Sequence, residues 1–243
     1  MKKYLLSLAV LGVSTFLVTG CTHKPATAAT PSGVDSQKSQ VADRVQMATD
    51  DLNQLMNTPD AEVPQTILAK AKCVAVIPDM VKGGFVIGGK HGRGLATCRT
   101  GNGWSAPAPI TVTGGSWGAQ IGVQSADVVL LFMNQGAVDS LLHDKLKLGG
   151  EASIAAGPVG RDAQAATDLK LNSQILSYSR TKGLYAGLDL SGAAVRQDMD
   201  TTVAMYGHSV PFTRILSGQV HAPADSMAFI HAVEKDFQLA KTE

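Results

Sequence analysis

Two glycine-rich segments place cationic side chains where they could bind an anion. The segments are Lys82-Gly83-Gly84 and Gly88-Gly89-Lys90-His91-Gly92-Arg93-Gly94. Glycines let backbone N–H groups approach an anion, lysine supplies charge, and arginine supplies paired donors for phosphate. Neither segment has the G-x-x-x-x-G-K-[ST] pattern of a nucleotide-binding P-loop. We therefore predict a head-group or other anion site at Lys82, Lys90, His91 and Arg93, with a solvated hairpin tip as the alternative.

Four later residues extend this prediction. Basic groups that could reach the same end of a sheet are Arg161, Lys170, Arg180 and Lys182. Equally, Arg161 could pair with Asp162 or Asp168 and fix its loop, and an exposed pair of this kind contributes at most about 1 kcal/mol. Both interpretations stay open from the sequence.

A third pattern is typical of catalysis. Gly114-Gly115-Ser116-Trp117-Gly118 fits the G-x-S-x-G pattern of a hydrolase nucleophile, which needs a strand, a sharp turn carrying the serine, and then a helix. Here the residues after Ser116 continue to alternate like a strand, so the sequence favours a glycine-rich strand or bulge. We predict no enzyme, and serine hydrolysis is only the third hypothesis.

Composition limits the class of protein. The chain has 243 residues, a formal net charge of +1, 44% hydrophobic residues and 17% charged residues. It is long enough for one sizeable core and is not disordered. Nucleic-acid binding would call for clustered basic residues in a basic domain, so we predict no nucleic-acid partner. No cysteine or histidine pair has metal-ligand spacing, so we predict no metal site and no cofactor.

The first residues have the features of a targeting segment. Lys2 and Lys3 precede an apolar run, Tyr4 to Val18, that is short for a membrane span. Val18-Thr19-Gly20-Cys21 then resembles a bacterial lipobox, in which Cys21 would be lipidated, with palmitate among its acyl chains. A plain secretory signal with a chance cysteine is the alternative. We predict a signal peptide over residues 1–20 and a lipidated flexible tether over 21–40.

The expected location follows from the same segment. Resemblance to lipoprotein sorting rules favours the outer membrane, because Thr22 is not aspartate. We expect an outer-membrane lipoprotein of the bacterial cell envelope that faces the periplasm. In that oxidising compartment Cys73 and Cys98 could form a disulfide, with two buried reduced thiols as the alternative.

After the tether the pattern is first helical and then strand-like. Apolar residues recur at helical spacing from Val41 to Leu55, and Pro64 to Ala71 is a short second helix. Short strands are expected at 73–77, 85–88 and 94–97, separated by turns at Pro78-Asp79, Gly83-Gly84, Gly88-Gly89 and Gly101-Asn102-Gly103. The stretch Ile110 to Phe132 alternates at first and ends in an apolar run that is typical of a strand buried on both faces.

The remainder is mixed. Asn134 is expected to cap a helix at 135–143, residues 175–178 and 184–190 to form a hairpin, and three helices to lie at 198–206, 212–216 and from 225 or 226 onward. The fold class is therefore α+β. We predict a single β-rich domain over residues 41–243, with an antiparallel meander or barrel-like sheet and flanking N- and C-terminal helices.

Four blocks of sequence resemble one known family. They are AKCVAVIPDMVKGGFVIGGKHGRG, WSAPAPITVTGGSWGAQIGVQSADVVLLFMN, GGEASIAAGPVGR and YSRTKGLYAGLDLSG. These blocks are similar, in order, to the signature blocks of the SYLF domain family. The resemblance implies a non-catalytic module that binds phosphoinositides or other anionic lipids, with yeast actin-binding relatives. The lipobox and tether depart from the eukaryotic pattern, which has an N-terminal amphipathic segment instead.

Two hypotheses therefore lead. In the first, an outer-membrane lipoprotein binds phospholipid, phosphoinositide-type or other anionic head groups through its glycine-basic loops, in addition to its acyl anchor. In the second, the domain is an envelope scaffold that contacts another protein through a sheet edge or the first helix, with no lipid site.

Overall fold

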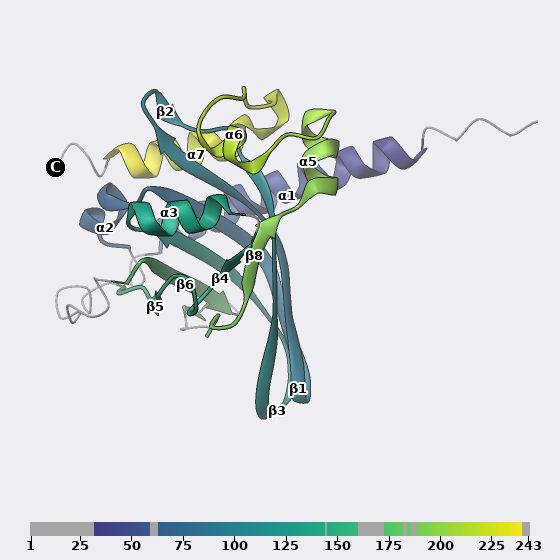
Figure 1. Cartoon of the computed structure of the whole chain (residues 1–243), viewed down its shortest axis with the longest axis vertical. Coiled ribbons are helices and arrows are strands. Elements are labelled where there is room, and N and C mark those ends of the chain that lie inside the picture. The colour runs from purple at the N-terminus through teal and green to yellow at the C-terminus, as the bar shows by residue number, and fades with distance from the viewer. Residues whose placement is uncertain are drawn as a thin grey trace, which may run out of the picture. The chain divides into compact units, whose positions relative to one another are not determined.

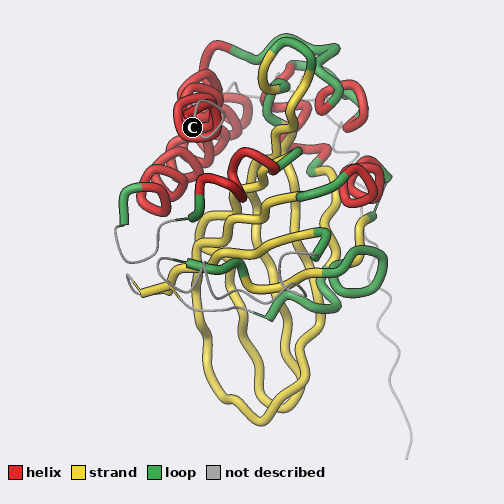
Figure 2. The backbone as a smooth tube through the Cα atoms, turned by 90° about the vertical axis from the view of Figure 1, so that its left-hand side faces the viewer, coloured by secondary structure: helices red, strands yellow, loops and turns green. Residues whose placement is uncertain are grey.

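Two long strands form the centre of the molecule. Strands β1 (Cys73–Thr100) and β3 (Ala108–Phe132) pair antiparallel along almost their whole length, from Cys73 opposite Phe132 to Ala96 opposite Ala108. In Figure 1 this β1–β3 ribbon runs away from the helices, and in Figure 2 its strand segments bend over and converge at one end. The ribbon therefore has two halves joined by a bend near residues 85–87 and 117–121.

The computed structural model describes residues 32–58, 63–143, 145–159, 173–181, 184–185 and 189–239. Residues 32–35, 85–87, 116–122, 184–185 and 238–239 are described by their backbone only. The chain from Ser32 onward forms one compact unit. The predicted signal peptide and Cys21 lie outside the described residues.

Three of the turns predicted within β1 are wrong. The strand passes through Pro78-Asp79, Gly83-Gly84 and Gly88-Gly89 without reversing, with register shifts between Ile77 and Met80 and between Gly84 and Val86. Proline has no N–H to donate to a neighbouring strand. The first register shift leaves Pro78 without a ladder partner, so it can lie within the strand. The turn at residues 101–103 is confirmed, and it leads into β2 (Gly103–Trp104).

Glycine has a different role in β1 from the one that the sequence indicates. A Cβ added to Gly94 would lie 2.1 Å from the carbonyl oxygen of Val76, and one added to Gly92 would lie 2.6 Å from Ile77 Cγ2. The second half of β1 therefore packs directly on the first half. Cys73 and Cys98 form a disulfide that also joins the two halves, across a sequence separation of 25.

The remaining strands extend this pair into a curled sheet. Its order is β2-β1-β3-β6-β5, with β6 at Ile175–Thr181 and β5 at Ile154–Ala156. Strand β8 (Ala194–Gln197) pairs with β3 and with β4 (Leu146–Lys147), and β7 (Leu184–Tyr185) pairs with β6. The pairing of β5 with β6 is parallel, so the sheet is not a pure meander. The prediction of an α+β domain with a barrel-like sheet is confirmed.

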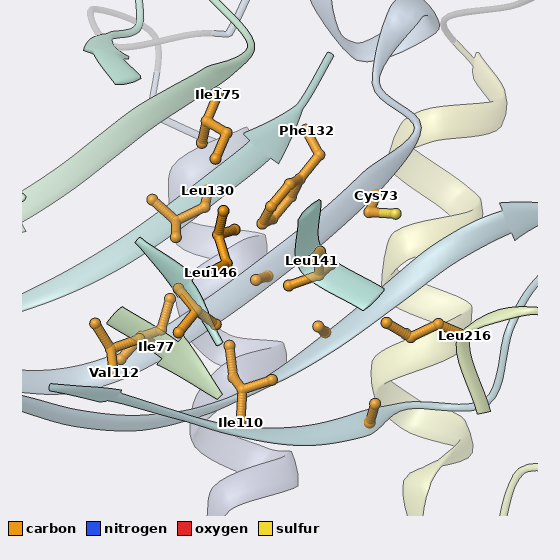
Figure 3. Close-up of a cluster of buried hydrophobic side chains, with 14 of the residues drawn as sticks. Cys73, Ile77, Ile110, Val112, Leu130, Phe132, Leu141, Leu146, Ile175 and Leu216 are labelled. Carbon is orange, nitrogen blue, oxygen red and sulfur yellow. The ribbon is translucent and has the colours of Figure 1, made fainter. Parts of the chain in front are cut away.

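Helices cover both faces of the sheet. Helices α1 (Ser32–Met56), α2 (Gln65–Lys70) and α7 (Met227–Leu239) pack with Val74, Val76, Val129 and Leu131. The opposite face holds Cys73, Ala75, Val128 and Leu130 against α3 (Gln135–Leu142) and α6 (Phe212–Leu216). Figure 3 shows this second core, in which Leu141 and Leu216 lie near the strand residues. The run from Asp127 to Phe132 is thus buried on both faces, as predicted.

Local signals for the helices were largely correct. The Asn134 side chain accepts a hydrogen bond from Ala137 N and begins α3, and Asp198 accepts one from Thr201 N and begins α5 (Met199–Tyr206). A short 3₁₀ turn, η3 (Ala224–Ser226), precedes α7. Helix α1, however, begins at Ser32, so residues 32–40 are helical and not part of a flexible tether.

Candidate anion-binding face

Lys90 is buried and binds the main chain of the protein itself. Its side chain is buried, and its Nζ donates to the carbonyl oxygens of Asp189 and Ser191 at 2.7 and 3.3 Å. Burial lowers the pKa of Lys90, and the charge of Asp189 opposes that shift. Lys90 thus holds the segment before β8 against the ribbon. It does not point freely to solvent as the head-group prediction requires, so that prediction is corrected for Lys90.

Arg180 is also engaged inside the protein. Its guanidinium donates to Asp127 Oδ2 at 2.6 Å and lies 3.4 Å from Asp51 Oδ1, and it also contacts Gln54. Asp127 lies directly opposite Arg180 in the β3–β6 ladder, and Asp51 comes from α1. Arg180 therefore joins α1 to the sheet, which corrects its prediction as a head-group ligand.

The carboxylates around Arg180 predict an unusual pH dependence. Burial, followed by the charge of Asp127, raises the pKa of Asp51 from 3.8 to about 7, although Arg180 opposes the shift and Asp79 adds to it. Between pH 5 and 7 the folded state then holds a proton on Asp51 that the unfolded state has lost. Stability contributed by this group is therefore greatest at acid pH and falls as pH rises toward 7, by at most about 1.4 kcal/mol per pH unit.

Asp51→Asn tests this directly. We expect the free energy of unfolding, measured by urea denaturation between pH 5 and 8, to depend less on pH in the variant than in the unsubstituted chain. Asp50→Asn, at the exposed neighbouring position, is the matched control and should keep the original slope. Equal slopes for all three proteins would contradict the raised pKa.

Two of the predicted cations lie on an exposed face. His91 and Arg93 are exposed, whereas Lys90, Gly92 and Gly94 between and beside them are buried. This alternation defines an outer face of the ribbon, which carries the odd-numbered residues of its β1 strand. Arg93 is opposite Thr111 in β3, and Thr111 is opposite the exposed Arg196 in β8. Residues opposite each other share a face, so His91, Arg93 and Arg196 form one basic face.

A buried ion pair lies beside Arg93 of the basic face. Arg44 of α1 donates to Asp198 Oδ2 at 3.2 Å and to Thr201 Oγ1 at 2.8 Å, and Arg93 Nε lies 3.9 Å from the same carboxylate oxygen. Burial raises the pKa of Asp198, but hydrogen bonds from Thr201 and the charges of Arg44 and Arg93 outweigh it, so the pKa lies below its usual value. Asp198 therefore stays charged at neutral pH and orients Arg93, which keeps 53% of its side chain exposed.

Lys82 occupies an intermediate position. Its side chain is half-buried on the first half of the ribbon, opposite Gln124. Its charge acts on both Lys90 and Asp189, which places it near the bend. In the ladder Lys82 shares a face with Met80 and Ala126, so it lies on the inner face of the ribbon with Lys90 and not on the basic face. Three further predicted ligands, Arg161, Lys170 and Lys182, lie outside the described residues.

Two residues of the site, Arg196 and Arg44, are not predicted from the sequence. Arg196 joins the basic face only through the β3–β8 register, and Arg44 meets Asp198 across a sequence separation of 154. A weak signal existed for Arg196, since it is the charged residue of the short segment AVRQ and charged residues usually face solvent. No local signal exists for the partner of Arg44, because helical periodicity alone does not reveal which element covers it.

The structure bears on two further predictions. Ser116 lies in the β1–β3 ladder opposite Gly88, so its backbone continues as a strand and does not form the strand-turn-helix of a nucleophile elbow. Among the described residues, no group of three His, Cys, Asp or Glu side chains could hold a metal ion. No helix in the described part of the chain is long and apolar enough to cross a membrane.

Comparison with known proteins identifies relatives. Residues 113–236 match the Ysc84 family, described as "Las17-binding protein actin regulator". The chain is 38% identical over 166 residues to SH3 domain-containing protein PJ696.02 of Schizosaccharomyces pombe, which covers 67% of this chain and 38% of that protein. It is 34% identical over 179 residues to Protein YSC84 of Saccharomyces cerevisiae, covering 72% and 38%.

A mammalian relative is similar over a longer stretch. The chain is 30% identical over 198 residues to SH3 domain-containing YSC84-like protein 1 of Rattus norvegicus, which covers 81% of this chain and 57% of that protein. The chain thus matches between 38% and 57% of the length of these three relatives. The four sequence blocks, the matched family and the extent of the similarity agree: this chain belongs to the Ysc84 family, the SYLF-domain family that the sequence resembles.

Proposed function

We propose that this chain is a lipid-anchored protein of the bacterial outer membrane whose Ysc84 domain binds anionic lipid head groups without catalysis. The observation that carries the proposal is the exposed basic face, in which His91, Arg93 and Arg196 lie on neighbouring strands. Arginine guanidinium groups donate paired hydrogen bonds to phosphate, and threonine hydroxyls on the same face add donors. Acylation at Cys21 would keep the face close to the bilayer, so a weak site could be occupied.

Ligands other than lipid are less well supported. The family description names a binding and regulatory role and no reaction, which is consistent with a non-catalytic module. The nearly neutral chain favours a local patch over a general polyanion surface. The three side chains of the basic face stand on strands β1 and β8, each of which pairs with β3. Exposed side chains on a sheet surface can reach head groups at a membrane, whereas small-molecule sites are usually concave.

The test is vesicle co-flotation of residues 22–243, which retain the whole compact unit from Ser32 onward. Vesicles of phosphatidylcholine alone are compared with vesicles that also contain phosphatidylglycerol, cardiolipin or a phosphoinositide. We expect binding only with anionic lipid, and weaker binding as salt rises, since exposed charges are screened within about 10 Å at 0.1 M salt. Equal binding to neutral vesicles, or none to any vesicle, would contradict a head-group site.

The family comparison favours one alternative. Its description names binding to a protein, Las17, so a protein partner in the envelope is the second candidate function for this chain. In that case the chain would not bind vesicles once the anchor is removed. Cross-linking of the full-length lipoprotein in isolated outer membranes should then give one discrete partner at a fixed ratio.

A further inference from the structure

The outer face of the ribbon carries two exposed valines near its bend. Val123 of β3 is 80% exposed and Val81 of β1 is 42% exposed. Val123 is directly opposite Gly83, and Val81 is directly opposite Ser125, so the two valines are diagonal neighbours on one face. On the other face of the same half, Met80 and Ala126 are buried. The two valines are therefore apolar groups that the fold leaves in water.

Around Val123, strand β3 pairs on one side only among the described residues. Within the part of the chain that the structure describes, residues 114–126 of β3 pair with β1 and with no other strand. Figures 1 and 2 show the end of the ribbon lying apart from the helices. The backbone of the bend carries the sequences Phe85-Val86-Ile87 and Trp117-Gly118-Ala119-Gln120-Ile121. Exposed apolar groups on such a strand pair, as at Val81 and Val123, form a binding surface or an aggregation hazard.

The net charge of the residues around the bend indicates which kind of surface could bind there. Residues 80–95 and 108–126 contain no aspartate or glutamate, and the first of these ranges contains Lys82, His91 and Arg93 in addition to the buried Lys90. A flanking carboxylate is that of Asp79, which accepts a hydrogen bond from Ser125, so positive charge is in excess around the bend. A second copy of this chain would bring like charges together at the same place. A surface that is apolar inside and negative at its boundary complements the ribbon end on both counts. An anionic bilayer is such a surface.

We infer that the bent end of the β1–β3 ribbon inserts into the interface of an anionic bilayer, with Val81 and Val123 entering the acyl boundary. This inference rests on the proposed function. It adds how deeply the domain enters the membrane and in which orientation. The bend enters the bilayer edge-on, and Lys82 and the basic face remain at the level of the phosphates. Apolar burial then holds the domain in place, while the arginines select negative lipid.

The inference is tested with one fluorescent label at a time. In residues 22–243 the only two cysteines form the Cys73–Cys98 disulfide, so Val123→Cys introduces a single thiol for the environment-sensitive dye NBD. Val203→Cys on α5 is the matched control, because Val203 is also an exposed valine. With phosphatidylglycerol vesicles we expect blue-shifted, brighter emission from position 123 and little change from position 203.

Affinity gives a second readout that does not depend on the label. Val123→Glu removes apolar burial and adds a charge that anionic lipid repels, so vesicle affinity should fall about tenfold or more. Val203→Glu should leave affinity within about twofold, a difference near the scatter for exposed substitutions. Near- and far-ultraviolet circular dichroism confirms that both variants keep the fold.

The possible outcomes separate this inference from the proposed function. If the unsubstituted chain binds anionic vesicles but position 123 stays in water and Val123→Glu binds normally, ribbon insertion is wrong and the head-group proposal stands. If no vesicle binds the chain, both are wrong. If Val123→Glu abolishes a self-association seen in sedimentation while vesicle binding is unchanged, the ribbon end is an interface between copies, and insertion is again wrong.

Discussion

Gly94→Ala is expected to destabilise the protein by about 3 kcal/mol or more, at the upper end of the range for overpacked sites. The new Cβ would meet the Val76 carbonyl oxygen at 2.1 Å and Ile77 Cα at 2.9 Å. These are backbone atoms, which cannot rotate aside as a flexible side chain could. The two halves of β1 would have to separate where Gly94 packs on Val76 and Ile77.

Urea denaturation measures this loss, and Gly89→Ala is its control. Gly89 lies in the same strand, but a Cβ there would come no closer than 4.0 Å to Gly114 O. Its substitution should be neutral or slightly stabilising, because alanine loses less backbone entropy on folding than glycine does. If both variants lost the same stability, the close approach at Gly94 would not be the cause.

Asp198→Ala should destabilise the protein by about 3 to 5 kcal/mol, the usual cost of breaking a buried ion pair. Arg44 would be left with one hydrogen-bond acceptor, Thr201 Oγ1, and α5 would lose its N-terminal cap. The same carboxylate orients Arg93, so vesicle binding should also weaken. Its depressed pKa means that this stabilisation is present above about pH 4 and is lost as pH falls further.

Asp200→Ala is the matched control on the same helix. Asp200 is exposed, in the first turn of α5, and its removal should change stability by less than about 1 kcal/mol. A thermal or urea unfolding curve for Asp198→Ala that matches the Asp200→Ala curve would show that the buried pair contributes little.

Local chemistry explains why parts of the fold were predictable. The Asn134 cap depends only on the residues that follow it, and the apolar run from Val128 to Phe132 indicates burial on both faces by itself. The turns predicted from the glycines of β1 are wrong because they too were predicted from local sequence alone. Glycine and Pro78 usually mark turns, but here the tertiary fold uses them for a bulge and for close backbone packing, which no local pattern reveals.

The candidate site was less predictable because its composition depends on distant partners. The burial of Lys90 requires Asp189 and Ser191, about 100 residues away in the chain, and glycine neighbours give no hydrophobic alternation to indicate which way Lys90 faces. Arg180 is withdrawn from solvent by Asp127 and Asp51. Conversely, Arg196 becomes part of the basic face only when β8 pairs with β3.

The most direct test of a lipid-binding basic face is the affinity of Arg93→Gln combined with Arg196→Gln for phosphatidylglycerol vesicles. Each arginine near an anionic surface contributes about 1 kcal/mol, so losing two should weaken binding roughly thirtyfold. Arg214→Gln, at an exposed position of α6, removes a charge elsewhere and should change affinity less than about threefold. Equal affinities for the double variant and the unsubstituted chain would contradict the basic face as the lipid site.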